Sequence, residues 1–241
     1  MSRHSKWSKV KQFKGAIDAK RSASFTKLSH EITVAVREKG PDASFNIRLR
    51  VAIDRAKKGF MPKDNIERAI KRGTGEGSEG AQLEQLTYEA YGPGRSALII
   101  ECVTDNRNRS VADIKTILMK NGGTFANAGS VTHLFDRLGV VRVNGSLPAD
   151  RKDEIELELI DAGAMDIVSA DDGTEIFTDP THLARVADEV QKQNLTIESA
   201  QFEWIAKMPI ELNEEDGTAV ANLVELLDEN DDVSQVYTNA E

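Results

Sequence analysis

The sequence predicts an α+β protein in which an N-terminal bundle of three helices precedes two α+β domains, one inserted into the other. Three observations predict this organisation. Apolar residues recur at three- and four-residue steps through the first third, strand-like and helix-like segments alternate from residue 85 onward, and a glycine-rich stretch separates the two patterns. We therefore expect a basic helical domain with its linker at 1–80, an α+β domain at 81–138 together with 206–241, and an inserted α+β domain at 139–205.

The first two helices follow from apolar spacing and from the residues that interrupt it. One helix is expected over 18–38, where "GPD" at 40–42 ends it. The second helix is expected to begin with Ser44 as its cap and to end at Gly59. The inward positions are Phe25, Leu28, Ile32 and Val36 in the first helix, and Phe45, Leu49, Ala52, Ile53 and Ala56 in the second.

The segment "MPKDNIERAIKRG" (61–73) predicts a short third helix. Pro62 suits a first helical turn, Asp64 favours the positive end of the helix dipole, and Gly73 suits a C-terminal cap. The inward residues are Ile66, Ala69 and Ile70, which leaves outward the cations Lys63, Arg68, Lys71 and Arg72. The stretch "GTGEGSEG" (73–80) predicts a linker, because it follows a helix and lacks the Gly-Lys-Ser/Thr ending of a phosphate-binding loop.

Strands and helices alternate after the linker. Strands are expected at "LTYEAYG", "SALIIECVTD", "SVTHLF", "GVVRV", "DIVSA", "EIFTD", "SAQFEWIA", "KMPIEL" and "VSQVYT". Helices are expected from Ser110 to Gly122, near 150–162, from Asp179 onward, and around 220–227. Residues 139–205 therefore predict the order β-α-β-β-α-β, and the flanking segments are expected to supply a second such unit.

Charge is divided unevenly along the chain. Residues 1–73 hold 19 Lys and Arg against 7 Asp and Glu, a net charge of +12, whereas residues 74–241 carry −21 and the whole chain −9. This asymmetry suggests a polyanionic partner for the first third. The alternative is that basic helix faces only keep the bundle soluble, but well-mixed charge would achieve that without the excess.

The opening segment "SRHSKWSKVKQFKG" (2–15) is basic, contains two aromatic residues and has no acid. Its Trp7 either stacks on unpaired bases or anchors the arm against the bundle, and Phe13 is expected in the core. With the outward cations and the arginines discussed next, the expected nucleic-acid contacts are Arg3, Lys6, Trp7, Lys9, Lys11, Lys14, Lys20, Arg21, Lys63, Arg68, Lys71, Arg72, Arg107 and Arg109.

The segment "TDNRNRS" (104–110) follows a predicted strand and precedes a predicted helix. Backbone amides at such a position favour anions, and Arg107 and Arg109 add charge and fork-like donors. The alternative is an ordinary helix-start turn, in which Asp and Asn act as capping residues. We expect a contact function, to RNA phosphate or to a protein partner.

The sequence gives little support to catalysis. The histidines His4, His30, His133 and His182 lie far apart without metal-ligand spacing. Cys102 lies in the strand-like run "ALIIECV" and is expected to be a buried thiol rather than a nucleophile. We expect no catalytic residue, metal site, cofactor or small-molecule substrate, and keep a metal-dependent nuclease as a third hypothesis.

Composition indicates a protein of the reducing cytoplasm. Hydrophobic residues make up 39% of the chain and charged residues 29%, and no apolar run approaches the roughly 20 residues that span a bilayer. The N-terminus lacks the apolar segment of a secretory signal. A single cysteine permits no internal disulfide. We therefore expect no membrane partner.

Several blocks resemble signatures of the YebC/PmpR family in order and spacing across nearly the whole chain. They are "HSKW" (4–7), "DAKR" (18–21), "FTKL" (25–28), "MPKDNIERAIKRGTGE" (61–76), "YEAYGPG" (88–94), "ECVTDNRNR" (101–109) and "GSVTHLF" (129–135). The resemblance implies a helical domain followed by two ferredoxin-like α+β domains. It also implies a non-enzymatic regulator of gene expression, described as DNA-binding in bacteria and as a translational activator in mitochondria.

These observations predict a non-enzymatic nucleic-acid-binding regulator that acts on RNA or the ribosome in translation through its basic helical domain. The acidic remainder favours a composite target such as the ribosome, because it would be repelled by a bare duplex. A DNA-binding transcriptional regulator is the alternative. The expected partners are rRNA or mRNA, or DNA, and the ribosome.

Overall fold

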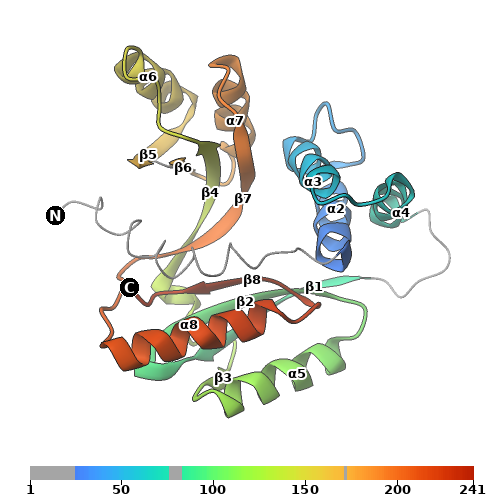
Figure 1. Ribbon diagram of the computed structural model, residues 1–241, viewed down its shortest axis with the longest axis vertical. Coiled ribbons are helices and arrows are strands. Elements are labelled where there is room, and N and C mark those ends of the chain that lie inside the picture. The colour runs from blue at the N-terminus through green and yellow to red at the C-terminus, as the bar shows by residue number, and fades with distance from the viewer. Residues whose placement is uncertain (1–24, 76–82, 171–172) are drawn as a thin grey trace.

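The computed structural model describes residues 25–75, 83–170 and 173–241. The basic arm at 2–15, with Lys20 and Arg21 beyond it, lies outside the described residues, as do linker residues 76–80. Within the described part the chain is an α+β protein, as predicted (Figure 1).

Three amphipathic helices form the N-terminal part: α2 (Phe25–Lys39), α3 (Ile47–Lys58) and α4 (Lys63–Thr74). Their shared core consists of Leu28, Ile32, Ala35, Val36, Leu49, Ala52, Ala56, Met61, Ile66 and Ala69. Most of the predicted inward positions are therefore buried. Figure 1 shows α2 and α3 between α4 and the long strands β4 and β7, so that α4 lies on the outer side.

Two expected core residues of this part are wrong. Phe25 is 44% exposed and Phe45 is 83% exposed. The cap of α3 also differs from expectation, because the side chain of Asn46, not Ser44, accepts a hydrogen bond from the Leu49 N–H at 3.0 Å. Ser44 instead bonds to Asp42, which places Phe45 in the turn before the helix.

Pro62 is the residue that precedes α4 and not part of its first turn as predicted, and the helix does not end at Gly73. Gly75 follows the last helical residue with φ of 79°, the left-handed conformation that glycine adopts without strain. Gly73 lies inside the helix, where a Cβ atom would be 2.5 Å from the Cβ of Val36 and 2.9 Å from the Thr33 carbonyl oxygen. Gly73 therefore permits the close approach of α4 to α2.

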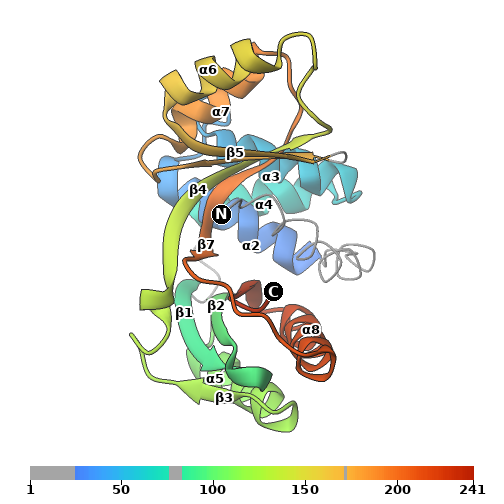
Figure 2. The ribbon, with the colours of Figure 1, turned by 90° about the vertical axis from the view of Figure 1, so that its left-hand side faces the viewer.

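The first sheet has the order β3-β1-β2-β8, and its neighbouring strands are antiparallel. Its strands are β1 (Glu84–Tyr91), β2 (Ala97–Thr104), β3 (Thr124–Ala126) and β8 (Val233–Thr238). Helices α5 (Arg107–Lys120) and α8 (Glu214–Asp228) cover one face through Ile114, Leu118, Leu223 and Leu227 (Figure 2). The strands take the positions of a split βαβ unit, but their order along the chain differs. Strand β1 lies where the third strand of such a unit would lie, although it comes first in the chain.

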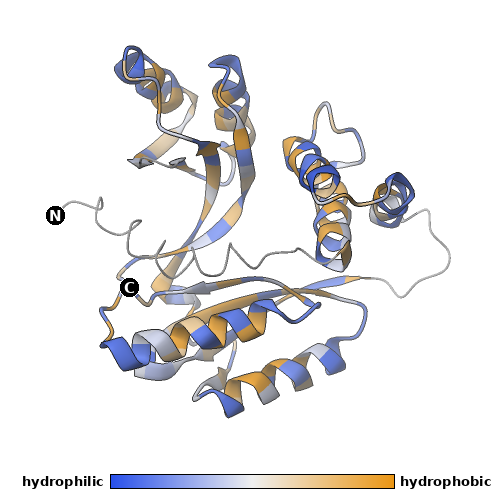
Figure 3. Ribbon diagram, in the orientation of Figure 1, coloured by the Kyte–Doolittle hydropathy of each residue, from blue (hydrophilic) through white to orange (hydrophobic). Residues whose placement is uncertain are grey.

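The second sheet has the order β5-β6-β4-β7 and lies, in sequence, between β3 and α8. Its strands are β4 (Phe135–Asn144), β5 (Ala164–Ala170), β6 (Gly173–Thr178) and β7 (Ile197–Ala206). Helices α6 (Lys152–Ala162) and α7 (Leu183–Lys192) pack on one face. The chain order is β-α-β-β-α-β, which confirms the predicted ferredoxin-like unit. Figure 3 shows that helices α6 and α7 each carry both hydrophobic and hydrophilic residues.

The two sheets are joined by β4 and β7, which pair from Phe135 opposite Ala206 to Val143 opposite Ile197. Their lower ends pack against the face of the first sheet that α5 and α8 leave open (Figure 2). There the indole N–H of Trp204 donates to Glu101 Oε1 at 3.0 Å. The helical part meets both sheets, because Val34 packs with Val103 and Ile47 joins the core of the second sheet.

The segment "SVTHLF" forms a short 3-10 helix at Thr132–Leu134 instead of the predicted strand. The buried carboxylate of Glu89 accepts the backbone N–H groups of Gly129 and Val131 at 2.6 Å and of Thr132 at 3.0 Å, together with the Thr132 hydroxyl at 2.6 Å. These bonds hold the segment as a turn and fix the start of β4.

Other segments also differ from expectation. Within the described residues, "KMPIEL" makes one isolated β-bridge, between Ile210 and Ala240, instead of a strand. The short strand β3 was not predicted. Ser110 is not the cap of α5, because the Asn106 side chain accepts from the Arg109 N–H at 3.1 Å and Ser110 is buried inside the first turn.

We expect Gly73→Ala to destabilise the protein by about 1–3 kcal/mol, because the added methyl group overpacks the α2–α4 contact. The sign is diagnostic, since alanine would stabilise an isolated helix by up to about 1 kcal/mol relative to glycine. Urea denaturation measures the effect. Thr74→Ala, one residue along on the exposed surface, is the control and should change stability by less than about 0.5 kcal/mol. A stabilised Gly73→Ala variant would contradict the packing.

We expect Glu89→Gln to cost about 1.5–3 kcal/mol at neutral pH, because the amide places an N–H group against backbone donors. Burial raises the pKa of Glu89, but hydrogen bonds from Thr132, Val131 and Gly129 outweigh it and hold the pKa below its ordinary 4.5. The contribution is therefore complete above pH 4.5 and is lost as the pH falls through the lower folded pKa. Glu84→Gln, on the same strand and exposed, is the control for denaturation across this range. An equal loss at all pH values would rule out a role for the charge.

Candidate nucleic-acid interface

The four cations predicted to face outward from α4 are exposed, which confirms their placement on the surface. The opposite side of the helix is fixed by Ile66 and Ala69, which are buried against α2 and α3. Arg68, Lys71 and Arg72 are three and four residues apart, so they are neighbours on the helix surface. Lys63 lies at the first turn of the same helix.

Acids on α4 offset little of this charge. Lys63 Nζ is 3.5 Å from Glu67 Oε1, but both side chains are more than half exposed, where an ion pair contributes little. Arg68 donates to the Asp64 carbonyl at 3.3 Å and to the side-chain oxygen of Asn65. Within the described residues, Lys71 and Arg72 make no ion pair. Their position in the last turn also suits the helix dipole, so these cations stabilise α4 itself.

Two further cations extend the surface and were missed by the sequence analysis. Lys57 and Lys58 are exposed in the last turn of α3, and the four residues 59–62 separate that helix from α4. Lys57 Nζ is 3.7 Å from Asp54 Oδ1, and both side chains are about two-thirds exposed. The run "RAKKG" was the available signal. We define the α3–α4 cationic surface as Lys57, Lys58, Lys63, Arg68, Lys71 and Arg72.

The remaining arginines of α3 are used inside the molecule. Arg55 pairs with Glu31 at 2.7 Å, and Arg48 pairs with Glu38. Arg50 donates to the Ala43 carbonyl at 3.1 Å and to Gln191 of α7 at 2.9 Å. Arg48, Arg50 and Arg55 are therefore engaged by other elements of the described chain, whereas the cations of α4 and of the end of α3 are exposed.

The two arginines of "TDNRNRS" have different surroundings. The Arg109 guanidinium contacts the Asp232 carboxylate at 2.9–3.2 Å and lies 3.1 Å from Asp105. Ser110 Oγ also donates to Asp232, at 2.8 Å. Burial raises the pKa of Asp232, but these bonds outweigh it and hold the pKa below its usual range. Arg107 is exposed and makes no ion pair within the described part of the chain.

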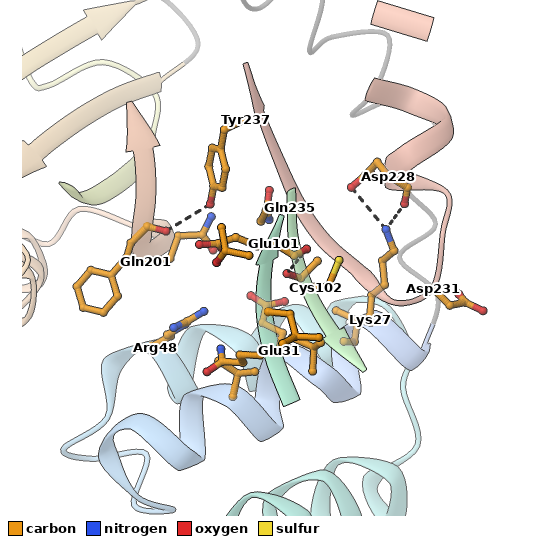
Figure 4. A pocket seen from close by; sticks show the side chains of 18 of the residues that line it. Lys27, Glu31, Arg48, Glu101, Cys102, Gln201, Asp228, Asp231, Gln235 and Tyr237 are labelled. Atoms are coloured by element: carbon orange, nitrogen blue, oxygen red, sulfur yellow. Dashed lines mark hydrogen bonds and ion pairs between the residues drawn. The ribbon is translucent and has the colours of Figure 1, made fainter. Parts of the chain in front are cut away.

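A cavity of about 430 Å³ lies between α2, the open face of the first sheet and β7 (Figure 4). Acids and bases alternate around it: Figure 4 shows Lys27 directed at Asp228, Arg48 and Glu31 on the helical side, and Glu101 on β2. Lys27 donates to the Asp228 carbonyl and lies 3.5 Å from its carboxylate. Burial raises the pKa of Glu101, and the bond from Trp204 opposes that change.

Cys102 borders this cavity and is buried, as predicted. Burial raises the pKa of its thiol to about 12, which disfavours the thiolate that a nucleophile requires. Over residues 25–75, 83–170 and 173–241, no three His, Cys, Asp or Glu side chains are grouped to hold a metal ion. The nuclease hypothesis gains no support from these residues.

Comparison with known proteins agrees with this architecture. Residues 5–76 match the profile of the TACO1/YebC protein N-terminal domain, and residues 83–240 match that of the TACO1/YebC second and third domain. The chain belongs to the TACO1/YebC family. This confirms the family resemblance found in the sequence.

Members of the TACO1/YebC family match this chain over nearly their whole length. Proteins of Persephonella marina and Shewanella oneidensis, each called "Probable transcriptional regulatory protein", are 44% identical over 100% of this chain and 96% of their own length. The crystal structure of a conserved hypothetical protein, Aq1575 of Aquifex aeolicus, aligns with a TM-score of 0.81 at 38% identity, covering 93% of this chain and 92% of that one. None of the helices described here is long and apolar enough to cross a membrane.

We expect substitution by glutamine to have different effects at Arg107 and at Arg109. Arg109→Gln should lower the free energy of unfolding by about 1 kcal/mol or more, because buried Asp232 loses its charged donor. Arg107→Gln should leave stability unchanged and weaken nucleic-acid binding. Thermal unfolding and a binding titration on both variants test this. Equal effects of the two substitutions on binding would contradict these different roles of Arg107 and Arg109.

Proposed function

We propose that this chain is a non-enzymatic regulator of gene expression that binds RNA, most directly on the ribosome, through the α3–α4 cationic surface. One observation carries the proposal: α4 turns its cations to solvent, whereas Arg48, Arg50 and Arg55 of α3 are engaged by Glu38, Gln191 and Glu31. Exposed lysines and arginines on one surface neutralise phosphates and release counterions, which gives affinity without base readout.

The relatives' names support a role in gene expression, since those proteins are called probable transcriptional regulatory proteins. The charge of the remainder supports RNA on a ribosome rather than a bare duplex. Residues 74–241 carry a net charge of −21, so a long uniform polyanion would be repelled from most of the molecule. A composite of RNA and basic protein accommodates both signs. Such a protein would act in the cytoplasm.

A DNA-binding transcriptional regulator is the second candidate, and the printed names of the relatives favour it. The cationic surface by itself suits either nucleic acid, because phosphates are common to both. Binding measurements on RNA and DNA of the same sequence therefore discriminate between the two.

We expect the combined change of Lys63, Arg68, Lys71 and Arg72 to glutamine to weaken RNA binding strongly and to reduce the salt dependence. Four lost phosphate contacts should lower the slope of log affinity against log salt by about 3 on a single strand. The control removes the same charge from exposed lysines elsewhere, with Lys115, Lys120, Lys152 and Lys192 changed to glutamine.

The full-length chain and both variants are titrated with an RNA oligonucleotide and with a DNA duplex of the same sequence at several salt concentrations. Equal losses in the two variants would show that overall charge, not this surface, governs binding. Tighter binding of the duplex by the unchanged protein would favour the transcriptional candidate instead.

A further inference from the structure

The turn between α3 and α4 carries an exposed aromatic side chain, Phe60, which lies in sequence between Lys58 and Lys63 of the cationic surface. Phe60 is 89% exposed, although a phenylalanine gains most when it is buried. We infer that Phe60 is a stacking site for an unpaired nucleobase, so that the ligand of this surface is single-stranded RNA. The inference rests on the proposed function and adds the class of nucleic acid to it.

The turn holds Phe60 in a fixed position. The Gly59 N–H donates to the Arg55 carbonyl at 2.8 Å, the Phe60 N–H to the Lys57 carbonyl at 3.0 Å, and the Met61 N–H to the Ala56 carbonyl at 2.9 Å. Met61 is buried in the core of the helical part, and Pro62 follows it directly. A ring on such a backbone is presented to a ligand with little further ordering, which favours binding.

The backbone at Phe60 is also strained. Its φ of 60° lies in the left-handed region, which bulky residues seldom adopt. Asparagine or glycine would suit the turn better. Phe60 therefore combines an unfavourable backbone conformation with an exposed ring. Within the described chain, no packing of the ring offsets the cost of either. A residue retained under those conditions is a candidate for a binding role.

The charges around Phe60 match a nucleotide. Lys57 and Lys58 precede it in the last turn of α3, and Lys63 follows it at the start of α4, all three exposed. A base stacked on the ring carries its own phosphates, which these lysines can neutralise. Stacking of this kind is independent of sequence because every base has a flat face, and it requires bases that are not already paired.

Phe45 provides a matched comparison within the same helical part. It is 83% exposed, but its neighbours are Asp42, Ser44 and the capping residue Asn46. The nearest arginines of α3, Arg48 and Arg50, are engaged with Glu38 and Gln191. Phe45 therefore has similar exposure, but the arginines beside it are bonded to other elements, whereas the ion pairs of Lys57 and Lys63 lie within their own helices and are more than half exposed.

The test measures dissociation constants of full-length Phe60→Leu, Phe60→Tyr and Phe45→Leu for a single-stranded RNA oligonucleotide and for the RNA duplex of the same sequence. Phe60→Leu keeps an apolar side chain but removes the π face, and we expect it to weaken single-strand binding by roughly 5- to 150-fold. Phe60→Tyr and Phe45→Leu should bind as the unchanged protein does. Duplex binding should be unaffected in all three.

A second readout reports stacking directly. An RNA strand with 2-aminopurine at one position should lose fluorescence on binding the unchanged protein and Phe60→Tyr, and much less on binding Phe60→Leu at saturation. Melting temperatures of the variants check that each is folded.

Unchanged single-strand affinity in Phe60→Leu would overturn the inference, as would equal losses on single strand and duplex, which would indicate a wedge between paired bases. These results differ from failure of the proposed function. In that case the unchanged protein itself would bind neither RNA with the expected salt dependence.

Discussion

The packing of α4 on α2 determines which side chains the helical part presents to its surroundings. Gly73 lets the two helices approach until no Cβ atom fits between them, and Ile66 and Ala69 complete the buried side. Once that side is fixed, the helical period places Arg68, Lys71 and Arg72 on the other. A hydrophobic contact between two helices therefore controls the electrostatics of the surface.

The rest of the fold supports this arrangement by using its own charges internally. Arg48 and Arg55 pair with acids of α2, and Arg109 is held by Asp232 between the first turn of α5 and β8. The helical part is packed against both sheets, so α4 is carried on a rigid frame. The acidic α+β part and the cationic helices are thus parts of one molecule with opposite net charge.

Local sequence patterns predicted the elements whose determinants are local. The helix α4 and the β-α-β-β-α-β order of the second sheet were both predicted correctly, because the spacing of apolar residues specifies them. The misplaced caps of α3 and α5 are choices between nearby polar residues, but other features depend on partners distant in sequence. Glu89 turns residues 129–132 away from a strand, and Asp232 occupies Arg109 from 123 positions away. Phe60 was missed because its exposure depends on how the turn is held, which no periodicity reveals.

Crosslinking in cells, followed by identification of the bound nucleic acid, shows whether the α3–α4 cationic surface contacts RNA. We expect the unchanged chain to recover ribosomal RNA through crosslinks on α3 and α4. Recovery should fall when the cations of α4 are replaced by glutamine but not when lysines of α5, α6 and α7 are replaced. Recovery of promoter DNA in place of RNA, or crosslinks confined to the acidic α+β part, would contradict this expectation.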